Sequence, residues 1–322
     1  MRELIVCVLI FFPLSVGAGQ GAKFWLNKMS TAVESLNYEG TFVFMHDHKM
    51  ETMHIIHGSD PLGVKERLIS LNGEAREVIR DKDVLTCIWP KSHVLVVEKS
   101  RVRQGFPAAI PEEIDTLVDH YDLLVVGTSR IAGFDCRVIE IRPKDHYRYG
   151  YRLCIAEGSG MLLKSAMLDT EGNPIEQVMF TGIEFLDDIP EVRFKPSAIF
   201  ADSVKHTILA RDYPTALQPD LGWRIDRMPA GFRVNENVKR PIAASTLPVQ
   251  HMIVTDGLAS VSIFIAKPDA VNEFFSGAIG RGALHAHAFN INQHQVTVVG
   301  EVPRNTVKMI GESIMYRGGE RD

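Results

Sequence analysis

The chain has 322 residues, of which 45% are hydrophobic and 23% are charged, so it is long and apolar enough to form about two globular domains. Its formal net charge is −5 at pH 7 and its pI is about 6.2. No run rich in lysine or arginine occurs, which argues against a nucleic-acid partner bound through its phosphates.

The first 18 residues have the order of a secretory signal peptide. Arg2 gives a positive start, Leu4 to Leu14 is almost wholly apolar, and the small residues 16–18 resemble a cleavage site. The alternative is a membrane anchor, but this apolar run is too short to cross a hydrocarbon core of about 30 Å. We therefore predict an exported protein, cleaved after Ala18, with Ala22 as the alternative position.

The N-terminal half changes from helical to strand periodicity at Tyr38. Residues 23–37 predict a helix, because their apolar side chains recur at a spacing near 3.6. A second, short helix is expected from Pro111 to about residue 119. Alternating strands are expected at residues 41–46, 51–57, 64–71, 74–80, 84–89, 94–98, 123–129, 136–142, 149–156, 161–168 and 176–186. So many strands in meander order predict one antiparallel sheet, curled into an open half-barrel that limits its exposed edges.

The strongest single turn signal is Asn72-Gly73, because both residues tolerate a positive φ, and Asp256-Gly257 is another hairpin signal. Further along the chain, prolines 190, 196, 214 and 219 accompany little periodicity and indicate a linker. A small α+β domain is expected after it, with strands at residues 249–255, 258–266, 283–290 and 295–302 and a helix from about residue 305 whose apolar face carries Val307, Ile310 and Ile314. The predicted divisions are a signal peptide at 1–18, a large domain at 19–200, a linker at 201–222 and a small domain at 223–318.

Catalytic and metal-binding patterns are missing from the sequence. The histidine pairs 46/48 and 285/287 have no third ligand at a spacing typical of zinc. The sequence also has no nucleophile elbow, no His-Glu-x-x-His and no phosphate-binding loop. We therefore expect no metal, no cofactor and no enzymatic activity.

A lipid-binding cavity is a better candidate for a site. The concave face of a curved sheet under covering helices can leave an apolar pocket. Phe42 and Phe44 alternate onto one face of the first strand, and Val94 and Val96 onto one face of another. An ordinary packed core is the alternative, and the sequence leaves both open.

The mature chain keeps three cysteines, Cys87, Cys136 and Cys154. Symmetric pairing of the strands on either side of residues 143–147 places Ile139 opposite Tyr151 and Cys136 opposite Cys154. Directly opposed residues at a non-hydrogen-bonded site lie about 4.5 Å apart at Cα, which permits a disulfide. A slip of one residue would place the two cysteines on opposite faces. Two reduced, buried thiols are the alternative.

Short blocks along the mature chain resemble one known family. In chain order they are Asn37 to Phe44, Lys65 to Leu68, Leu71 to Gly73, Glu77 to Arg80, Ile131 to Gly133, Pro143 to Asp145, Arg148 to Leu153, Gly160 to Ser165, Pro229 to Phe232, Thr255 to Ser262 and Val296 to Pro303. The ordered set, behind a signal peptide, is similar to the RseB/MucB family. Cysteines at positions 136 and 154 are not part of the pattern of that family.

The resemblance implies a large domain shaped like the carriers LolA and LolB, and a small C-terminal α+β domain. It implies a periplasmic, non-enzymatic negative regulator of envelope-stress (sigma-E) signalling. Such a protein binds the periplasmic segment of a membrane-bound RseA/MucA-type anti-sigma factor, shields it from the site-1 protease and releases it on a lipid or lipopolysaccharide signal. No catalytic residues carry over, and the contact residues and any homo-oligomer stay open. A plain periplasmic carrier of lipids or lipoproteins is the alternative, although it would not need the second domain.

Overall fold

The computed structural model describes residues 18–47, 49–91, 94–99, 114–197, 206–209, 222–240, 247–267 and 276–317. The predicted signal peptide, apart from Ala18, lies outside these residues, as does most of the predicted linker. Within the described ranges, no helix is long and apolar enough to span a membrane.

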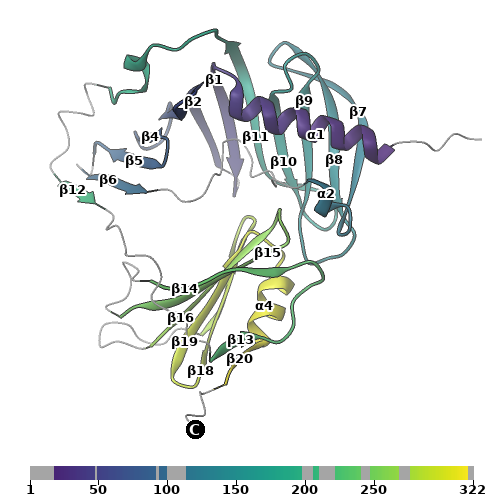
Figure 1. Cartoon of the computed structure of the whole chain (residues 1–322), viewed down its shortest axis with the longest axis vertical. Helices are drawn as coiled ribbons and strands as arrows, with labels where there is room; N and C mark the ends of the chain where they lie inside the picture. Colours follow the sequence, from purple (N-terminus) through teal and green to yellow (C-terminus); the bar gives the residue numbers. More distant parts are fainter. Residues whose placement is uncertain are drawn as a thin grey trace, which may run out of the picture.

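One large antiparallel sheet dominates the N-terminal domain (Figure 1). Its meander strands are β1 (Tyr38–His46), β2 (Lys49–Asp60), β3 (Gly63–Ser70), β4 (Glu77–Asp81), β5 (Val84–Trp89), β6 (Val94–Lys99), β7 (Tyr121–Ile131), β8 (Phe134–Pro143), β9 (Gly150–Ala156), β10 (Leu162–Leu168) and β11 (Pro174–Phe185). A short strand β12 (His206–Leu209) adds to β6 in parallel. The strand order is β12-β6-β5-β4-β3-β2-β1-β11-β10-β9-β8-β7, so the sheet stays open between β12 and β7.

Helix α1 (Ala18–Ser35) covers part of this sheet (Figure 1). Its apolar stripe of Ala22, Leu26, Met29 and Val33 is buried in the core, which explains why the helical spacing predicted this element. The helix packs mainly against β7, with further contacts to β2, β8 and β10. A second helix, α2 (Ile114–Leu117), and a 3₁₀ turn, η1 (Glu191–Phe194), complete the domain.

The turn at Asn72 is longer than the two-residue hairpin that its sequence predicts, because β4 begins only at Glu77. The carboxamide of Asn72 explains the difference, since it bonds back to β2. Its Oδ1 accepts a hydrogen bond from the backbone of Thr52 at 2.6 Å, and its Nδ2 donates to the carbonyl of Met50 at 3.0 Å. This residue therefore anchors the loop to the strand before the hairpin.

The predicted register of β8 and β9 is wrong by two residues. Ile139 lies opposite Leu153 rather than Tyr151, and Cys136 lies opposite Ala156 rather than Cys154. The loop between the strands is not the symmetric turn that the prediction assumed. Its Arg148 is completely buried and bonded to Asp256 outside the hairpin, a contact that a symmetric local turn does not include.

The described part of the C-terminal domain contains a six-stranded antiparallel sheet with a helix packed against it (Figure 1). The strands are β14 (Arg233–Arg240), β15 (Val249–Thr255), β16 (Ser260–Ala266), β17 (Gly277–Arg281), β18 (Leu284–Ile291) and β19 (His294–Gly300), in the order β14-β15-β16-β19-β18-β17. Helix α4 (Arg304–Glu312) packs against β18 and β19, and β13 (Trp223–Ile225) pairs with β20 (Ile314–Tyr316).

The predicted fold class is confirmed: a mostly antiparallel open sheet with covering helices, and a separate small α+β domain. Sequence periodicity located β15, β16, β18, β19 and α4, and it missed β13, β14, β17 and β20. Ile314 begins β20 instead of extending the last helix. The segment predicted as a linker contributes β12 to the N-terminal sheet.

Candidate functional site at the junction of the two domains

A completely buried arginine lies at the centre of the contact between the domains. The Nη1 of Arg148 lies 2.7 Å from Oδ2 of Asp256, and both side chains have no exposed surface. The Nη2 of the same guanidinium donates to the carbonyl of Ala230 at 2.6 Å and lies 3.1 Å from Asp145. Its Nε donates to Asp145 at 3.2 Å. The charge is therefore matched by two carboxylates and a carbonyl, which a buried charge requires.

Two aromatic rings enclose the guanidinium. Its carbon lies 5.4 Å from the ring centre of Tyr121 and 5.1 Å from that of Phe232, one ring from each domain. The hydroxyl of Tyr121 donates to Oδ2 of Asp256 at 2.9 Å. Burial, together with the negative charge of Asp256, raises the pKa of Tyr121. The tyrosine therefore stays a neutral hydrogen-bond donor to the carboxylate.

Asp256 is positioned by its own turn. It follows β15, and Gly257 beside it has a φ of 101°, a conformation that favours glycine. Its Oδ1 accepts the backbone N–H groups of Leu258 at 2.9 Å and Ala259 at 2.7 Å. The other oxygen is left for the arginine and the tyrosine. The Asp-Gly pair was predicted as a turn, and the structure shows that its aspartate also connects the domains.

Contacts at the edge of the junction surround this centre. The hydroxyl of buried Thr306, at the start of α4, donates to the carbonyl of Tyr147 at 2.6 Å. The hydroxyl of Tyr149 lies 3.4 Å from Nδ1 of His285. An exposed pair, Arg281 with Asp47 at 2.8 Å, links the domains further out. Both domains therefore meet through several elements, with the buried ion pair in the middle.

The four cavity candidates lie on one face of the large sheet. The pairing from β1 through β6 aligns Phe42 and Phe44 with Val94 and Val96 on that face. Phe42 is fully buried, with its ring 5.8 Å from that of Phe180, whereas Phe44 and Val96 are half-buried. The side chain of Val94 lies outside the described residues. The strand register therefore places Phe42, Phe44 and Val96 on one face, and the role of the four candidates in lipid binding stays a prediction.

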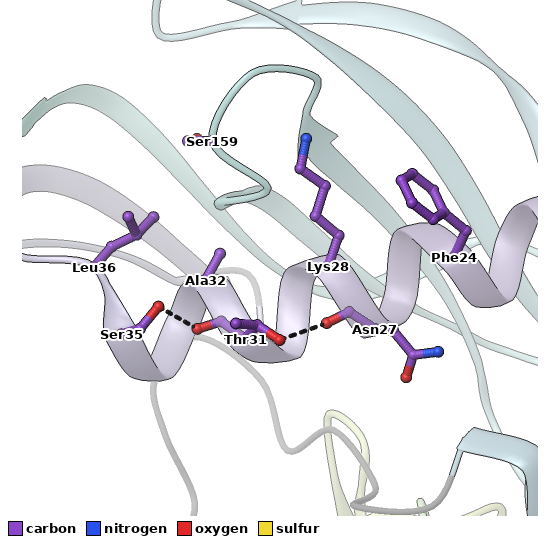
Figure 2. A pocket seen from close by; sticks show the side chains of 8 residues that line it. All are labelled: Phe24, Asn27, Lys28, Thr31, Ala32, Ser35, Leu36 and Ser159. Atoms are coloured by element: carbon purple, nitrogen blue, oxygen red, sulfur yellow. Dashed lines mark hydrogen bonds between the residues drawn. The ribbon is translucent and has the colours of Figure 1, made fainter.

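An open depression of about 420 Å³ lies along α1 and the β9–β10 turn (Figure 2). Phe24 at one end of it is 61% exposed. The Nζ of Lys28 donates to the carbonyls of Glu157 at 2.6 Å and Gly158 at 2.9 Å, which ties the helix to the turn. None of the four cavity candidates lines this depression. Among the described residues, no three histidine, cysteine or acidic side chains gather as a metal site.

The fold and the junction define a two-domain, β-rich protein whose domains are joined by buried polar contacts. A family model described as the MucB/RseB N-terminal domain matches residues 21–198, and one described as the MucB/RseB C-terminal domain matches residues 218–315. The chain belongs to the MucB/RseB family.

Similar proteins include two regulators. The chain is 28% identical to the sigma factor AlgU regulatory protein MucB of Pseudomonas aeruginosa, over 98% of each protein. It is 25% identical to the sigma-E factor regulatory protein RseB of Haemophilus influenzae, over 92% of this chain and 91% of that protein.

Solved structures of MucB give the same fold. A crystal structure of MucB in complex with MucA(peri) matches with a TM-score of 0.71 at 26% identity, over 92% of this chain and 100% of that one. A crystal structure of MucB alone matches with a TM-score of 0.64 at 26% identity, over 92% and 98%.

Proposed function

We propose that this chain is a periplasmic regulator that binds the periplasmic segment of a membrane-bound anti-sigma factor of the MucA/RseA type. The observation that carries the proposal is its likeness over nearly its whole length to MucB solved with MucA(peri). The junction adds support, because Arg148 and Asp256 hold the two domains as one unit that can present a continuous binding surface.

The bound segment is protected from the site-1 protease in this proposal, and a lipid signal ends the protection. A bound peptide is accessible to a protease only in the fraction of time that it is free. A lipid that prefers another arrangement of the protein must weaken binding of the segment by the same factor as the segment weakens lipid binding. Each acyl methylene buried on the face of Phe44 and Val96 would contribute about 0.8 kcal/mol to that change.

A pull-down from inner-membrane extract tests the partner. The mature protein, beginning at Gly19, should recover a single-span anti-sigma factor. Recovery of lipoproteins alone would instead favour a periplasmic carrier, the alternative function.

Fractionation of cells tests the location, since the protein should appear in the periplasm with Gly19 as its first residue. A full-length product retained in the cytoplasm or the membrane would contradict export.

A cleavage assay tests shielding and release. The mature protein should slow site-1 cleavage of the captured anti-sigma segment, and added lipopolysaccharide should restore the rate. Phe44→Ala should weaken the lipopolysaccharide effect, whereas Met45→Ala is the matched control. Both side chains are half-buried on β1, but they face opposite sides of the sheet. Equal effects of the two variants would remove the lipid role of the Phe44 face.

A further inference from the structure

Two cysteine thiols meet in the N-terminal core. Cys136 on β8 and Cys154 on β9 occupy the same face of adjacent strands, where each lies diagonally across from the other. Their side chains are joined by a hydrogen bond, and Cys136 is 0% and Cys154 6% exposed. The register correction therefore replaces the directly opposed pair by a diagonal pair and keeps the thiols in contact.

We propose that Cys136 and Cys154 are a disulfide-forming site, closed by exchange with a protein or small-molecule disulfide and readily reopened by a thiol. One thiolate attacks the oxidant disulfide and forms a mixed disulfide, and the second thiol then displaces the oxidant sulfur. The pair loses two electrons and two protons. The oxidant gains both and leaves as two thiols.

The diagonal geometry makes this bridge a reducible one. Diagonal neighbours lie farther apart than directly opposed residues, and a disulfide spans only about 4.4–6.8 Å between Cα atoms. Closing the bond therefore draws β8 and β9 together beyond their relaxed pairing. A strained disulfide is reduced more easily than a relaxed one.

The folded core restricts when the bridge forms. Burial, and to a lesser degree the hydrogen bond with Cys154, raise the pKa of Cys136 to about 12, so little thiolate exists in the native protein near neutral pH. Both thiols belong to one hairpin and approach each other as soon as it forms. Oxidation is therefore fastest during folding, before the core closes.

The third cysteine provides an internal reference. Cys87 lies on β5, opposite Val78 and Val96, in the other half of the sheet. In the order of the sheet, strands β4, β3, β2, β1, β11 and β10 lie between Cys87 on β5 and the cysteine pair on β8 and β9. It cannot reach either thiol in this fold, so it should remain available for alkylation.

Thiol mapping tests the site. The mature protein is refolded with oxidised glutathione, denatured, alkylated without reduction and analysed by peptide mass spectrometry. The expected result is one alkylated residue, Cys87, and one linked pair of peptides that is lighter by two hydrogens. Cys87→Ser should leave the linked pair unchanged. Three alkylated cysteines, or a bridge that includes Cys87, would overturn the proposal.

Equilibration tests reducibility. The protein is refolded to equilibrium at a series of ratios of reduced to oxidised glutathione, so that exchange occurs while the thiols are accessible, and is then quenched with acid. The bridged fraction should fall from nearly complete to nearly absent within that series. A bridge that stays fully closed at every ratio would contradict the strained, reducible form.

Discussion

Arg148 at the domain junction and His251 in the C-terminal sheet are both almost completely buried, but their hydrogen-bonding surroundings are opposite. Arg148 is surrounded by Asp145, Asp256 and a backbone carbonyl, which compensate its positive charge. His251 on β15 is 2% exposed and is stacked on Phe264 at 4.4 Å. Neither of its ring nitrogens has a hydrogen-bond partner among the described residues.

The chemical consequence appears in the pKa of His251. Burial, with a smaller effect of the Arg240 charge, lowers that pKa to about 4. The imidazole is therefore uncharged near neutral pH. A buried ionisable group stays charged where the fold supplies opposite charge and hydrogen bonds, and it becomes neutral where the fold does not. The four predictions below test this contrast.

The largest effect is expected for Arg148→Ala. It leaves the carboxylate of Asp256 buried without its cation, which should lower the free energy of unfolding by about 3–5 kcal/mol. Urea denaturation measures the change. The matched control is Arg152→Ala, whose side chain is 48% exposed and 3.0 Å from Glu140, and which should cost less than about 1 kcal/mol. Similar losses in both variants would show that burial of the arginine does not determine how much its ion pair contributes to stability.

Acid should destabilise the C-terminal sheet through His251. The unfolded histidine titrates near 6.5 and the folded one at about 4, so the unfolded state binds more protons as the pH falls between these values. The contribution of His251 to the free energy of unfolding is therefore fully present above pH 6.5. It falls by about 3 kcal/mol as the pH decreases to about 4. His251→Phe should remove that share of the pH dependence. Parallel stability curves for the variant and the native chain would contradict the lowered pKa.

A smaller effect is expected for Tyr121→Phe. The variant loses the hydroxyl that donates to Asp256, and a hydrogen bond to a charged group contributes about 1.5–3 kcal/mol. Tyr38→Phe is the control, because the hydroxyl of Tyr38 is buried with no partner among the described residues. Its removal should leave stability unchanged or raise it. Thermal denaturation of both variants measures the difference, and a larger loss for Tyr38→Phe would reverse the interpretation.

The smallest effect is expected at the edge of the junction. Arg281→Ala removes an ion pair with Asp47 in which the arginine is 62% exposed. Exposed pairs contribute at most about 1 kcal/mol and are screened by salt. The variant should therefore unfold within about 0.5 kcal/mol of the native chain, and the difference should vanish at 1 M salt. A loss as large as that of Arg148→Ala would show that exposed contacts stabilise the junction as much as the buried ion pair does.

Much of the architecture was predictable from the sequence, since it depends on local patterns. The alternation from Tyr38 onward located the strands of the large sheet, and the stripe of Leu26, Met29 and Val33 located α1. The same alternation placed Phe42 and Phe44 on one face. The β8–β9 register was not predictable in this way, because Arg148 in the loop between these strands bonds to Asp256 of the other domain, and strand alternation does not reveal such a contact.

The candidate site was largely invisible in the sequence. Arg148 and Asp256 are 108 residues apart, and the only signal was that each lies within a block similar to the RseB/MucB family. Nothing local distinguishes this arginine from Arg152 four residues later. Only one of the two is enclosed by the second domain.

The sequence by itself determined the order and type of the main elements and the Asp-Gly turn, because these follow from short-range patterns. It also indicated the family, through the ordered blocks that resemble it. The tertiary structure decided which arginine is buried, which face of β8 and β9 brings the two cysteines together, and which histidine loses its charge. Those properties depend on the distance to groups far away in the chain and on the exclusion of water, which only the packed structure establishes.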